Sequence, residues 1–221
     1  MVSETFKNLP LPRQEAFLRA ALEEFAHHSY NDASVSRILR KLAIAKGSFY
    51  QYFGNKKGLY LYLKDKAEAQ KQAYIERTLA EGYQDFWDLY RKLYTAGSQF
   101  DLDHPLLSAF LYNLSQEKAL PDLATSWPEQ LDQGIRFFRR ILSEEQAQGR
   151  LNPDLNPDTM AYIIMQVGRG ITDWLAWKQQ INFRDNIQET GPVLGSHQEA
   201  LHRSVEEIAH ILKSGMNHDS R

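Results

Sequence analysis

The spacing of the apolar residues is the feature of this chain that most restricts its fold. Apolar residues recur three and four positions apart along most of the sequence, and no segment alternates apolar and polar residues long enough to suggest a sheet. Glycine and proline are few, with 12 and 8 in 221 residues, and they punctuate the periodic segments. The pattern predicts an all-α fold of about nine helices.

Capping and breaking residues set the expected helix limits. Ser34 and Asn156 have the side chains that cap helix starts, and Gly82 and Gly149 are suited to helix ends. Mixed polarity, two glycines and one proline over 183–196 predict a loop. The expected helices cover about 12–28, 34–42, 45–52, 56–80, 86–97, 103–114, 126–149, 156–174 and 201–212.

Positive charge gathers near the start of the chain, although the formal net charge is only −2. Residues 33–64 contain seven Lys or Arg and no Asp or Glu, whereas the later part of the chain is acidic. A basic segment attracts a polyanion, and the acidic remainder repels it, which orients the encounter. On charge alone, a solvated basic surface is the alternative interpretation.

Two short helices joined by a tight turn are expected inside this basic window, at 34–42 and 45–52. A helix-turn-helix has this arrangement: one helix braces against phosphates while the second enters the major groove. The run over 33–59, above all its Lys-Gly-Ser-x-Tyr-x-Tyr-Phe-x-x-Lys core at 46–56, resembles the DNA-binding domain of TetR-family transcriptional repressors. A weaker match at 148–158 resembles the loop before the eighth helix of that family. The resemblance implies a DNA-binding domain at 1–55 and a regulatory ligand-binding and dimerisation domain at 56–221.

Polar and small residues of the two short helices are the expected DNA contacts. Gly47 lets the backbone approach DNA, and the hydroxyl and amide groups around it can reach base edges or phosphate oxygens. Lys56 begins a helix whose amide-rich N-terminus also favours a phosphate. Core packing is the alternative for Tyr50, and a diffuse electrostatic role is the alternative for Arg40 and Lys41. The predicted DNA-binding residues are Ser34, Ser36, Arg37, Lys46, Gly47, Ser48, Tyr50, Gln51, Tyr52 and Lys56.

The motif departs from the family pattern in the turn. Ala43 stands where such proteins commonly have glycine, and Ala45 replaces the usual capping Ser or Thr. The lost cap weakens the following helix by about 1 kcal/mol. Leu39 and Leu42 replace smaller alanines, which affects the packing angle of the helix pair. These changes leave the basic window intact and make the operator sequence harder to predict.

Aromatic residues are frequent after residue 80. In proteins that this chain resembles, the fourth to eighth helices enclose a pocket for a small effector, and such pockets are mostly apolar with a few polar anchors. The resemblance therefore implies an apolar or amphipathic effector, with plain core packing as the alternative for each residue. The candidate ligand-binding residues are Tyr90, Tyr94, Phe110, Asn113, Phe138 and Met165.

Long apolar stripes mark the eighth and ninth expected helices. The resemblance implies that these helices pair across a two-fold axis, and two recognition helices must enter successive major grooves about 34–36 Å apart to read a palindrome. Gly168 and Gly170 would permit close helix approach. The predicted dimer interface consists of Val167, Gly168, Ile171, Trp174, Leu201, Val205, Ile208 and Leu212.

Several chemistries find no support in the sequence. The absence of cysteine excludes disulfides, thiolate nucleophiles and Cys-ligated metals. Phosphate-binding Gly-rich loops, G-x-S-x-G and H-E-x-x-H are also missing. His202, Glu206 and His210 have the spacing of metal ligands on one helical face, but the ligand set is incomplete. We therefore predict no catalytic residue, no cofactor and no metal.

The longest apolar runs are far shorter than the roughly 20 residues that span a bilayer, and the N-terminus lacks a signal-peptide pattern. A cytoplasmic protein without a membrane partner is expected. Taken with the motif, the sequence predicts a DNA-binding transcriptional regulator: a repressor that binds a palindromic operator as a homodimer and is released by a small effector. An all-α small-molecule carrier or scaffold without DNA binding is the alternative, but it leaves the basic window unexplained. The sequence leaves open the effector, the operator, the regulated genes and activation instead of repression.

Overall fold

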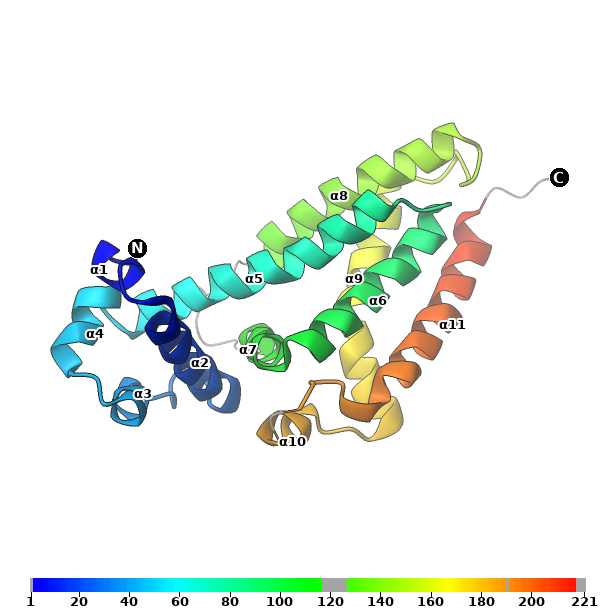
Figure 1. Cartoon of the computed structure of the whole chain (residues 1–221). Helices are drawn as coiled ribbons and strands as arrows, with labels where there is room; N and C mark the ends of the chain where they lie inside the picture. The colour runs from blue at the N-terminus through cyan, green and yellow to red at the C-terminus, as the bar shows by residue number, and fades with distance from the viewer. Residues whose placement is uncertain (1, 117–126, 190, 218–221) are drawn as a thin grey trace. The chain divides into compact units, whose positions relative to one another are not determined.

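The computed structural model describes residues 2–116, 127–189 and 191–217. Within these ranges the chain forms eleven α-helices, one short 3-10 helix (Gly195–His197) and no β-strand (Figure 1). All nine predicted helices form, which confirms the all-α prediction; residue 126, where the helix over 126–149 is expected to begin, lies outside the described residues. The α-helices are α1 (Glu4–Lys7), α2 (Leu11–His27), α3 (Val35–Leu42), α4 (Lys46–Phe53), α5 (Lys56–Glu81), α6 (Phe86–Asp103), α7 (Pro105–Gln116), α8 (Trp127–Ala147), α9 (Pro157–Gln179), α10 (Phe183–Gln188) and α11 (Gln198–Met216).

Backbone contacts divide the chain into two compact units. The first unit comprises Met1–Ala73, Phe100–Ala124 and Arg184–Val193. The second unit comprises Tyr74–Gln99, Thr125–Phe183 and Leu194–Arg221. The functional division at residues 55 and 56 stays a prediction, because compactness alone does not assign a function to either part.

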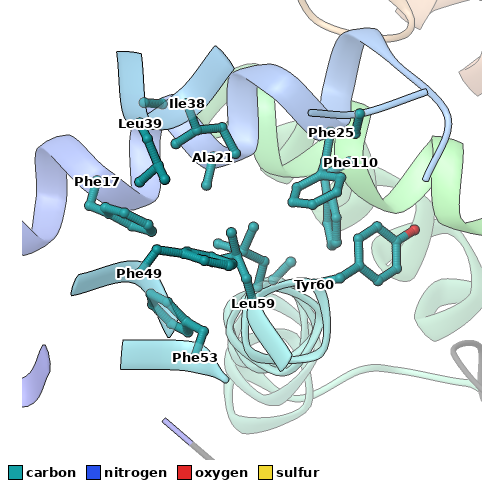
Figure 2. Close-up of a cluster of buried hydrophobic side chains, with 14 of the residues drawn as sticks. Phe17, Ala21, Phe25, Ile38, Leu39, Phe49, Phe53, Leu59, Tyr60 and Phe110 are labelled. Atoms are coloured by element: carbon teal, nitrogen blue, oxygen red, sulfur yellow. The ribbon is translucent and has the colours of Figure 1, made fainter. Parts of the chain in front are cut away.

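Apolar side chains from α1 to α5 and from α7 form the core of the first unit. Figure 2 shows Phe49 and Phe53 of α4 turned towards the same interior as Phe17 of α2 and Leu59 of α5. The rings of Phe17 and Phe53 are stacked with their centroids 5.3 Å apart. Burial of each such side chain contributes about 1.5–3 kcal/mol. The inner side of α4 is therefore firmly anchored, while its outer side remains at the surface.

Helix α1 is a short element that the periodicity does not predict. The side chain of Ser3 caps it by accepting a hydrogen bond from the backbone of Phe6 (3.4 Å), and the Phe6 ring is fully buried. The backbone N–H of Ser3 also donates to the carbonyl of Tyr52 in α4 (2.9 Å). Four residues are too few for a helical repeat to show in a sequence. The hydrogen bond from Ser3 nevertheless links the N-terminal segment to α4.

The predicted loop over 183–196 is wrong for its first six residues, which form α10. Phe183 and Ile187 lie four positions apart and are both buried, whereas the intervening residues are polar. A helix of six residues offers only one such apolar pair, so the polar majority conceals it in the sequence. Gly191 and Pro192 follow the helix, as expected for chain-breaking residues.

The turn between α3 and α4 explains the unusual Ala43. Its backbone is left-handed (φ 52°), and its N–H donates to the carbonyl of Arg40 (3.3 Å) while that of Ile44 donates to Leu39 (3.0 Å). This pattern is a Schellman motif, which glycine usually completes because a Cβ costs about 1–2 kcal/mol there. The turn therefore keeps its geometry without its preferred residue.

Substituting Ala45 with serine is expected to stabilise the first unit by about 1 kcal/mol. Ala45 precedes α4 with extended backbone angles and provides no side-chain cap, so a serine hydroxyl would satisfy a free N–H of the first turn. The midpoint of thermal unfolding, followed by far-UV circular dichroism at fixed protein concentration, measures the gain. Ala45→Val is the control without a cap, and equal midpoints for the two variants would contradict the capping argument.

The second unit contains most of α6 together with α8, α9 and α11. Gly149 (φ 72°) ends α8, and the side-chain amide of Gln146 holds the following loop by donating to the carbonyls of Asn152 (2.7 Å) and Leu155 (2.8 Å). Asn156 then caps α9 by accepting hydrogen bonds from the next turn, which confirms the predicted cap. None of the helices in the described ranges has the length and apolarity to cross a bilayer.

Candidate nucleic-acid interface

The outer face of α4 carries the central part of the predicted site. Lys46, Gly47, Tyr50 and Gln51 are exposed, whereas Phe49 is buried. Positions 46, 47, 50 and 51 share one face because residues three and four apart are neighbours on a helix. Tyr50 is 50% exposed and also touches the Phe49 ring edge-on, at 5.3 Å between centroids. Its hydroxyl-bearing ring is therefore held by the core without being enclosed in it.

Gly47 lies in open space. A Cβ built at this position would have no non-neighbouring atom within 4 Å outside the backbone of its own helix. Glycine within a helix costs about 1 kcal/mol relative to alanine. Packing of the described residues therefore does not require glycine here. A partner that approaches the backbone closely would require it.

Ser34 and Arg37 hold the start of α3 against α2. The hydroxyl of Ser34 accepts a hydrogen bond from the backbone of Arg37 (3.3 Å), which confirms the predicted cap. The Arg37 guanidinium donates to the Glu24 carboxylate (Nε–Oε1 2.9 Å) and to the carbonyl of Asp32 (2.8 Å). Glu24 also accepts the N–H of Ser34 (2.6 Å). Arg37, predicted as a DNA contact, thus has internal partners.

A second ion pair repeats this arrangement, because Lys41 of α3 donates to the carboxylate of Glu23 in α2. Residues 33–64 include no acidic residue, but the fold places Glu24 and Glu23 of α2 beside Arg37 and Lys41 of this window, respectively. Arg40 and Lys46 are exposed, and the Lys46 ammonium lies 6.0 Å from the ring centroid of Tyr50. The positive charge of the site is therefore concentrated more towards α4 than the sequence suggests.

The pKa of Glu24 makes the stability of this helix pair depend on pH. Burial alone would raise the pKa of Glu24, but the hydrogen bonds from Arg37 and from the backbone of Ser34 outweigh it, and the pKa lies below its ordinary value. The pKa of Glu23 is lowered as well, mainly by the hydrogen bond from Lys41. Both groups therefore stabilise the fold fully above their unfolded pKa, about 4.3, and lose this contribution as the pH falls through their folded pKa.

We expect the thermal midpoint of the first unit to fall as the pH is lowered below about 4.5. Glu24→Gln should lower the midpoint at neutral pH and flatten this acid dependence, because the variant has no carboxylate to protonate at position 24. Far-UV circular dichroism melts between pH 3 and 7 measure both effects. Exposed Glu15 is the matched control position, and Glu15→Gln should leave the profile unchanged.

The remaining predicted DNA contacts lie around this face with different surroundings. Lys56 begins α5, where its ammonium donates to the carbonyl of Asn31 (3.2 Å) and lies 4.7 Å from the ring centroid of Tyr30. Tyr52 is half-buried, and its ring centroid is 5.5 Å from that of Phe6. Ser36 is exposed and Ser48 is half-buried. Tyr52 thus contributes to the core as well as to the predicted site.

Four of the candidate ligand residues lie in the second unit. The Tyr90 and Tyr94 hydroxyls of α6 are 3.5 Å apart, and burial raises the pKa of both phenols, so they remain protonated. Phe138 of α8 meets Phe86 of α6 edge-on at 6.1 Å. Met165 packs so closely on Gly134 that a Cβ there would lie 2.3 Å from its sulfur. Phe86 and Phe138 thus join α6 to α8, whereas the Tyr94 hydroxyl lies against Gly168 of α9, where a Cβ would be 3.4 Å from it.

The other two candidate ligand residues, Phe110 and Asn113, lie in the first unit. Phe110 is fully buried, and its ring centroid is 5.0 Å from that of Tyr60. The Asn113 side-chain amide donates to the carbonyls of Phe25 (3.2 Å) and Ala26 (2.5 Å), at the end of α2. Both residues thus hold α7 to its own unit, which the apolar spacing of the sequence does not reveal.

The predicted dimer residues divide between the interior and the surface of one chain. Ile171, Leu201 and Val205 are buried within the protomer, so the packing of the second unit itself accounts for them. Val167, Gly168, Ile208 and Leu212 are half-buried. Trp174 is 44% exposed. Exposed apolar residues that the prediction omits lie on the same two helices, namely Tyr162, Ile163, Trp177 and Ile211.

His202, Glu206 and His210 of α11 have the sequence spacing of metal ligands. Glu206 accepts a hydrogen bond from Arg91 of α6 (2.8 Å). In the part of the chain that the structure describes, no group of three or more His, Asp or Glu side chains is arranged to hold a metal ion.

Comparison with known proteins assigns the chain to a family. The model of bacterial regulatory proteins of the tetR family matches residues 17–63, which contain α3 and α4. A crystal structure of a TetR family transcriptional regulator from Chloroflexus aurantiacus is 32% identical, covers 99% of both chains and gives a TM-score of 0.75. The chain belongs to the TetR family. It is thus a TetR-family DNA-binding transcriptional regulator with a helix-turn-helix.

Two further relatives have lower sequence identity. The transcriptional regulator AcuR of Cereibacter sphaeroides is 29% identical over 177 residues, which are 76% of this chain and 74% of AcuR. The uncharacterized HTH-type transcriptional regulator YdgC of Bacillus subtilis is 25% identical over 172 residues, which are 76% of this chain and 83% of YdgC. The predicted resemblance to the TetR family is confirmed.

Proposed function

We propose that this TetR-family protein is a cytoplasmic, non-enzymatic repressor that binds a palindromic operator as a homodimer. The observation that carries this proposal is the outer face of α4, where Lys46, Gly47, Tyr50 and Gln51 are exposed on a helix that the core holds in place. Such a helix supplies hydroxyl, amide and ammonium groups to the major groove. A carrier or scaffold would have no use for an exposed glycine and tyrosine in this pattern.

The proposal includes release of the operator by a small effector bound in the second unit. The support is the aromatic interior beside α6, where the hydroxyls of Tyr90 and Tyr94 lie 3.5 Å apart and the rings of Phe86 and Trp87 lie beside Tyr90. Such surroundings suit an apolar or amphipathic molecule with a hydrogen-bonding group. Helix α5 has residues in both units. We propose that this helix transmits the effect of effector binding to the helix-turn-helix. Because the two binding events are thermodynamically linked, the effector and the operator DNA must each lower the protein's affinity for the other by the same factor.

An electrophoretic mobility shift with the DNA upstream of the protein's own coding region tests the proposal. We expect a specific complex with the mass of a dimer on one palindromic fragment, and binding that weakens steeply with added salt, because phosphate contacts release counterions. A scrambled fragment of equal composition is the control. Equal binding to both fragments, or no binding at low salt, would contradict operator recognition.

Gly47→Ala is expected to raise the stability of the fold and to lower the affinity for the operator. Because the two changes have opposite signs, this variant distinguishes DNA binding from folding. Alanine should stabilise α4 by about 1 kcal/mol, since nothing in the chain opposes a Cβ there. The same methyl group should lower operator affinity about tenfold, because it stands between the backbone and the DNA. Thermal melts and mobility shifts on the same preparation measure the pair of effects. A variant with unchanged operator affinity would remove Gly47 from the site.

A further inference from the structure

The segment that contains α10 packs with the first unit, although the residues on both sides of it pack with the second. Residues 184–193 belong to the first unit by their contacts. Ile187 and Val193 are buried, and the N–H of Val193 donates to the buried carboxylate of Asp101 (2.8 Å). The side-chain amide of Asn186 donates to the carbonyl of Val193 (2.9 Å). The segment is therefore fixed within the first unit at several points.

His27, in the last turn of α2, connects this segment to the helices that precede the recognition helix. Its half-buried ring places Nε2 3.0 Å from the carbonyl oxygen of Ile187. A carbonyl oxygen only accepts hydrogen bonds, so Nε2 must carry the proton and donate it. The two residues are 160 positions apart in the sequence. The hydrogen bond therefore joins the end of α2 to a part of the chain far outside the helix-turn-helix.

The same turn of α2 holds the start of α3. Glu24 accepts hydrogen bonds from the guanidinium of Arg37 (2.9 Å) and from the N–H of Ser34 (2.6 Å). Glu24 and His27 are three residues apart, so they belong to one helical turn. A change in the direction of this turn moves the Glu24 carboxylate and the start of α3 with it. The short turn at Ala43 then carries that movement to α4.

Asn113 of α7 holds this turn of α2 independently of α10. Its amide donates to the carbonyls of Phe25 (3.2 Å) and Ala26 (2.5 Å), which are among the last four carbonyls of the helix and need partners outside it. Loss of the His27 hydrogen bond should therefore change the direction of the turn without unfolding it. A defect in DNA binding can then be distinguished from a defect in folding.

We infer that α10 positions the helix-turn-helix for DNA binding through the hydrogen bond between His27 and Ile187. His27 is a positioning residue, because it acts through Glu24 and the start of α3. This inference rests on the proposed operator-binding function and adds to it a determinant that lies outside the helix-turn-helix.

Variants that remove or keep the donor at position 27 test the inference. His27→Leu has no donor, whereas His27→Gln keeps an Nε2 donor at the same number of bonds from the backbone. In fluorescence anisotropy with the labelled upstream fragment, His27→Leu should bind about fivefold more weakly, the factor of one lost hydrogen bond, and His27→Gln should bind normally. Gln188→Leu, on the exposed side of α10, is the control and should also bind normally. Normal binding by His27→Leu, or equal losses for leucine and glutamine, would overturn the inference.

Ile187→Ala tests the other side of the contact, because it removes the buried side chain that anchors α10. This variant should also weaken binding, and adding His27→Leu to it should weaken binding by no more than about twofold further, since both changes break the same contact. Losses that multiply in the double variant would show that His27 acts without α10, which would overturn the inference.

Hydrogen exchange distinguishes this inference from the proposed function, because it needs no DNA. His27→Leu should raise the exchange rate of the Ser34 amide about fivefold, because the acceptor of that amide, Glu24, lies on the altered turn. The amides of α9, in the second unit, are the internal control and should not change. An unchanged rate at Ser34 would overturn positioning by α10 alone, whereas an unmodified protein that binds no upstream fragment would overturn the proposed function.

Discussion

Tyr50→Ala is expected to lower the affinity for the operator by about ten- to a hundredfold, the range for a lost side-chain contact in a groove. The side chain is half-exposed on the outer face of α4, so its removal should delete the proposed DNA contact and take little from the core. Fluorescence anisotropy with a labelled operator at fixed salt measures the loss. The melting temperature should change little, because surface substitutions usually alter stability by less than about 0.5 kcal/mol.

Tyr50→Phe is the matched control for that experiment, because it keeps the ring beside Phe49 and removes only the hydroxyl. A loss of affinity with both variants would assign the effect to hydrogen bonding by the hydroxyl. A loss with alanine alone would assign it to the ring. Operator affinity unchanged by Tyr50→Ala would mean that this tyrosine is not part of the interface, and the assignment of the α4 face would then be wrong.

Phe6→Ala is expected to destabilise the first unit by about 3–5 kcal/mol, as for other fully buried rings. The Phe6 ring lies 4.7 Å from that of Phe53 and 5.6 Å from that of Phe17, between centroids. Removing it leaves a cavity between α1, α2 and α4 and loosens the segment that Ser3 fastens to α4. This loss is a large part of the 5–15 kcal/mol by which most domains are stable.

Denaturation followed by two probes locates the effect of Phe6→Ala. All four tryptophans belong to the second unit, so their fluorescence reports on that unit, whereas far-UV circular dichroism reports on all helices. We expect the circular dichroism transition to move to lower denaturant concentration. Leu11→Ala is the control, because Leu11 is 70% exposed. A shift of less than about 1 kcal/mol for Phe6→Ala would contradict the role of α1 in the core.

Long elements could be predicted from the sequence because their periodicity has room to repeat. Helices α5, α8 and α9 extend over at least 21 residues each, and their stop signals, such as Gly82 and Gly149, have the left-handed backbone that glycine adopts most easily. Helices α1 and α10 have four and six residues, and their existence depends on Phe6 and Ile187 finding partners elsewhere in the chain. That information lies in tertiary packing and is absent from local spacing.

The candidate site could be predicted in its residue types but not in its pairings. The motif at 46–56 correctly places an exposed polar face on α4. The internal partners of Arg37 and Lys41 come from α2, 13 and 18 residues earlier, and a scan of charge along the chain does not bring those segments together. Asn113 illustrates the same limit, since its amide satisfies two carbonyls at the end of α2.

The carboxylates of Glu23 and Glu24 act as built-in counterions for two of the seven cations in residues 33–64. A cation that stays with its internal anion neutralises no phosphate when DNA binds. Each phosphate contact changes the logarithm of the binding constant by about −0.9 per logarithmic unit of salt. The ionic-strength dependence should therefore be shallower than seven charges imply, and the protein would remain on its operator over a wider range of cellular salt.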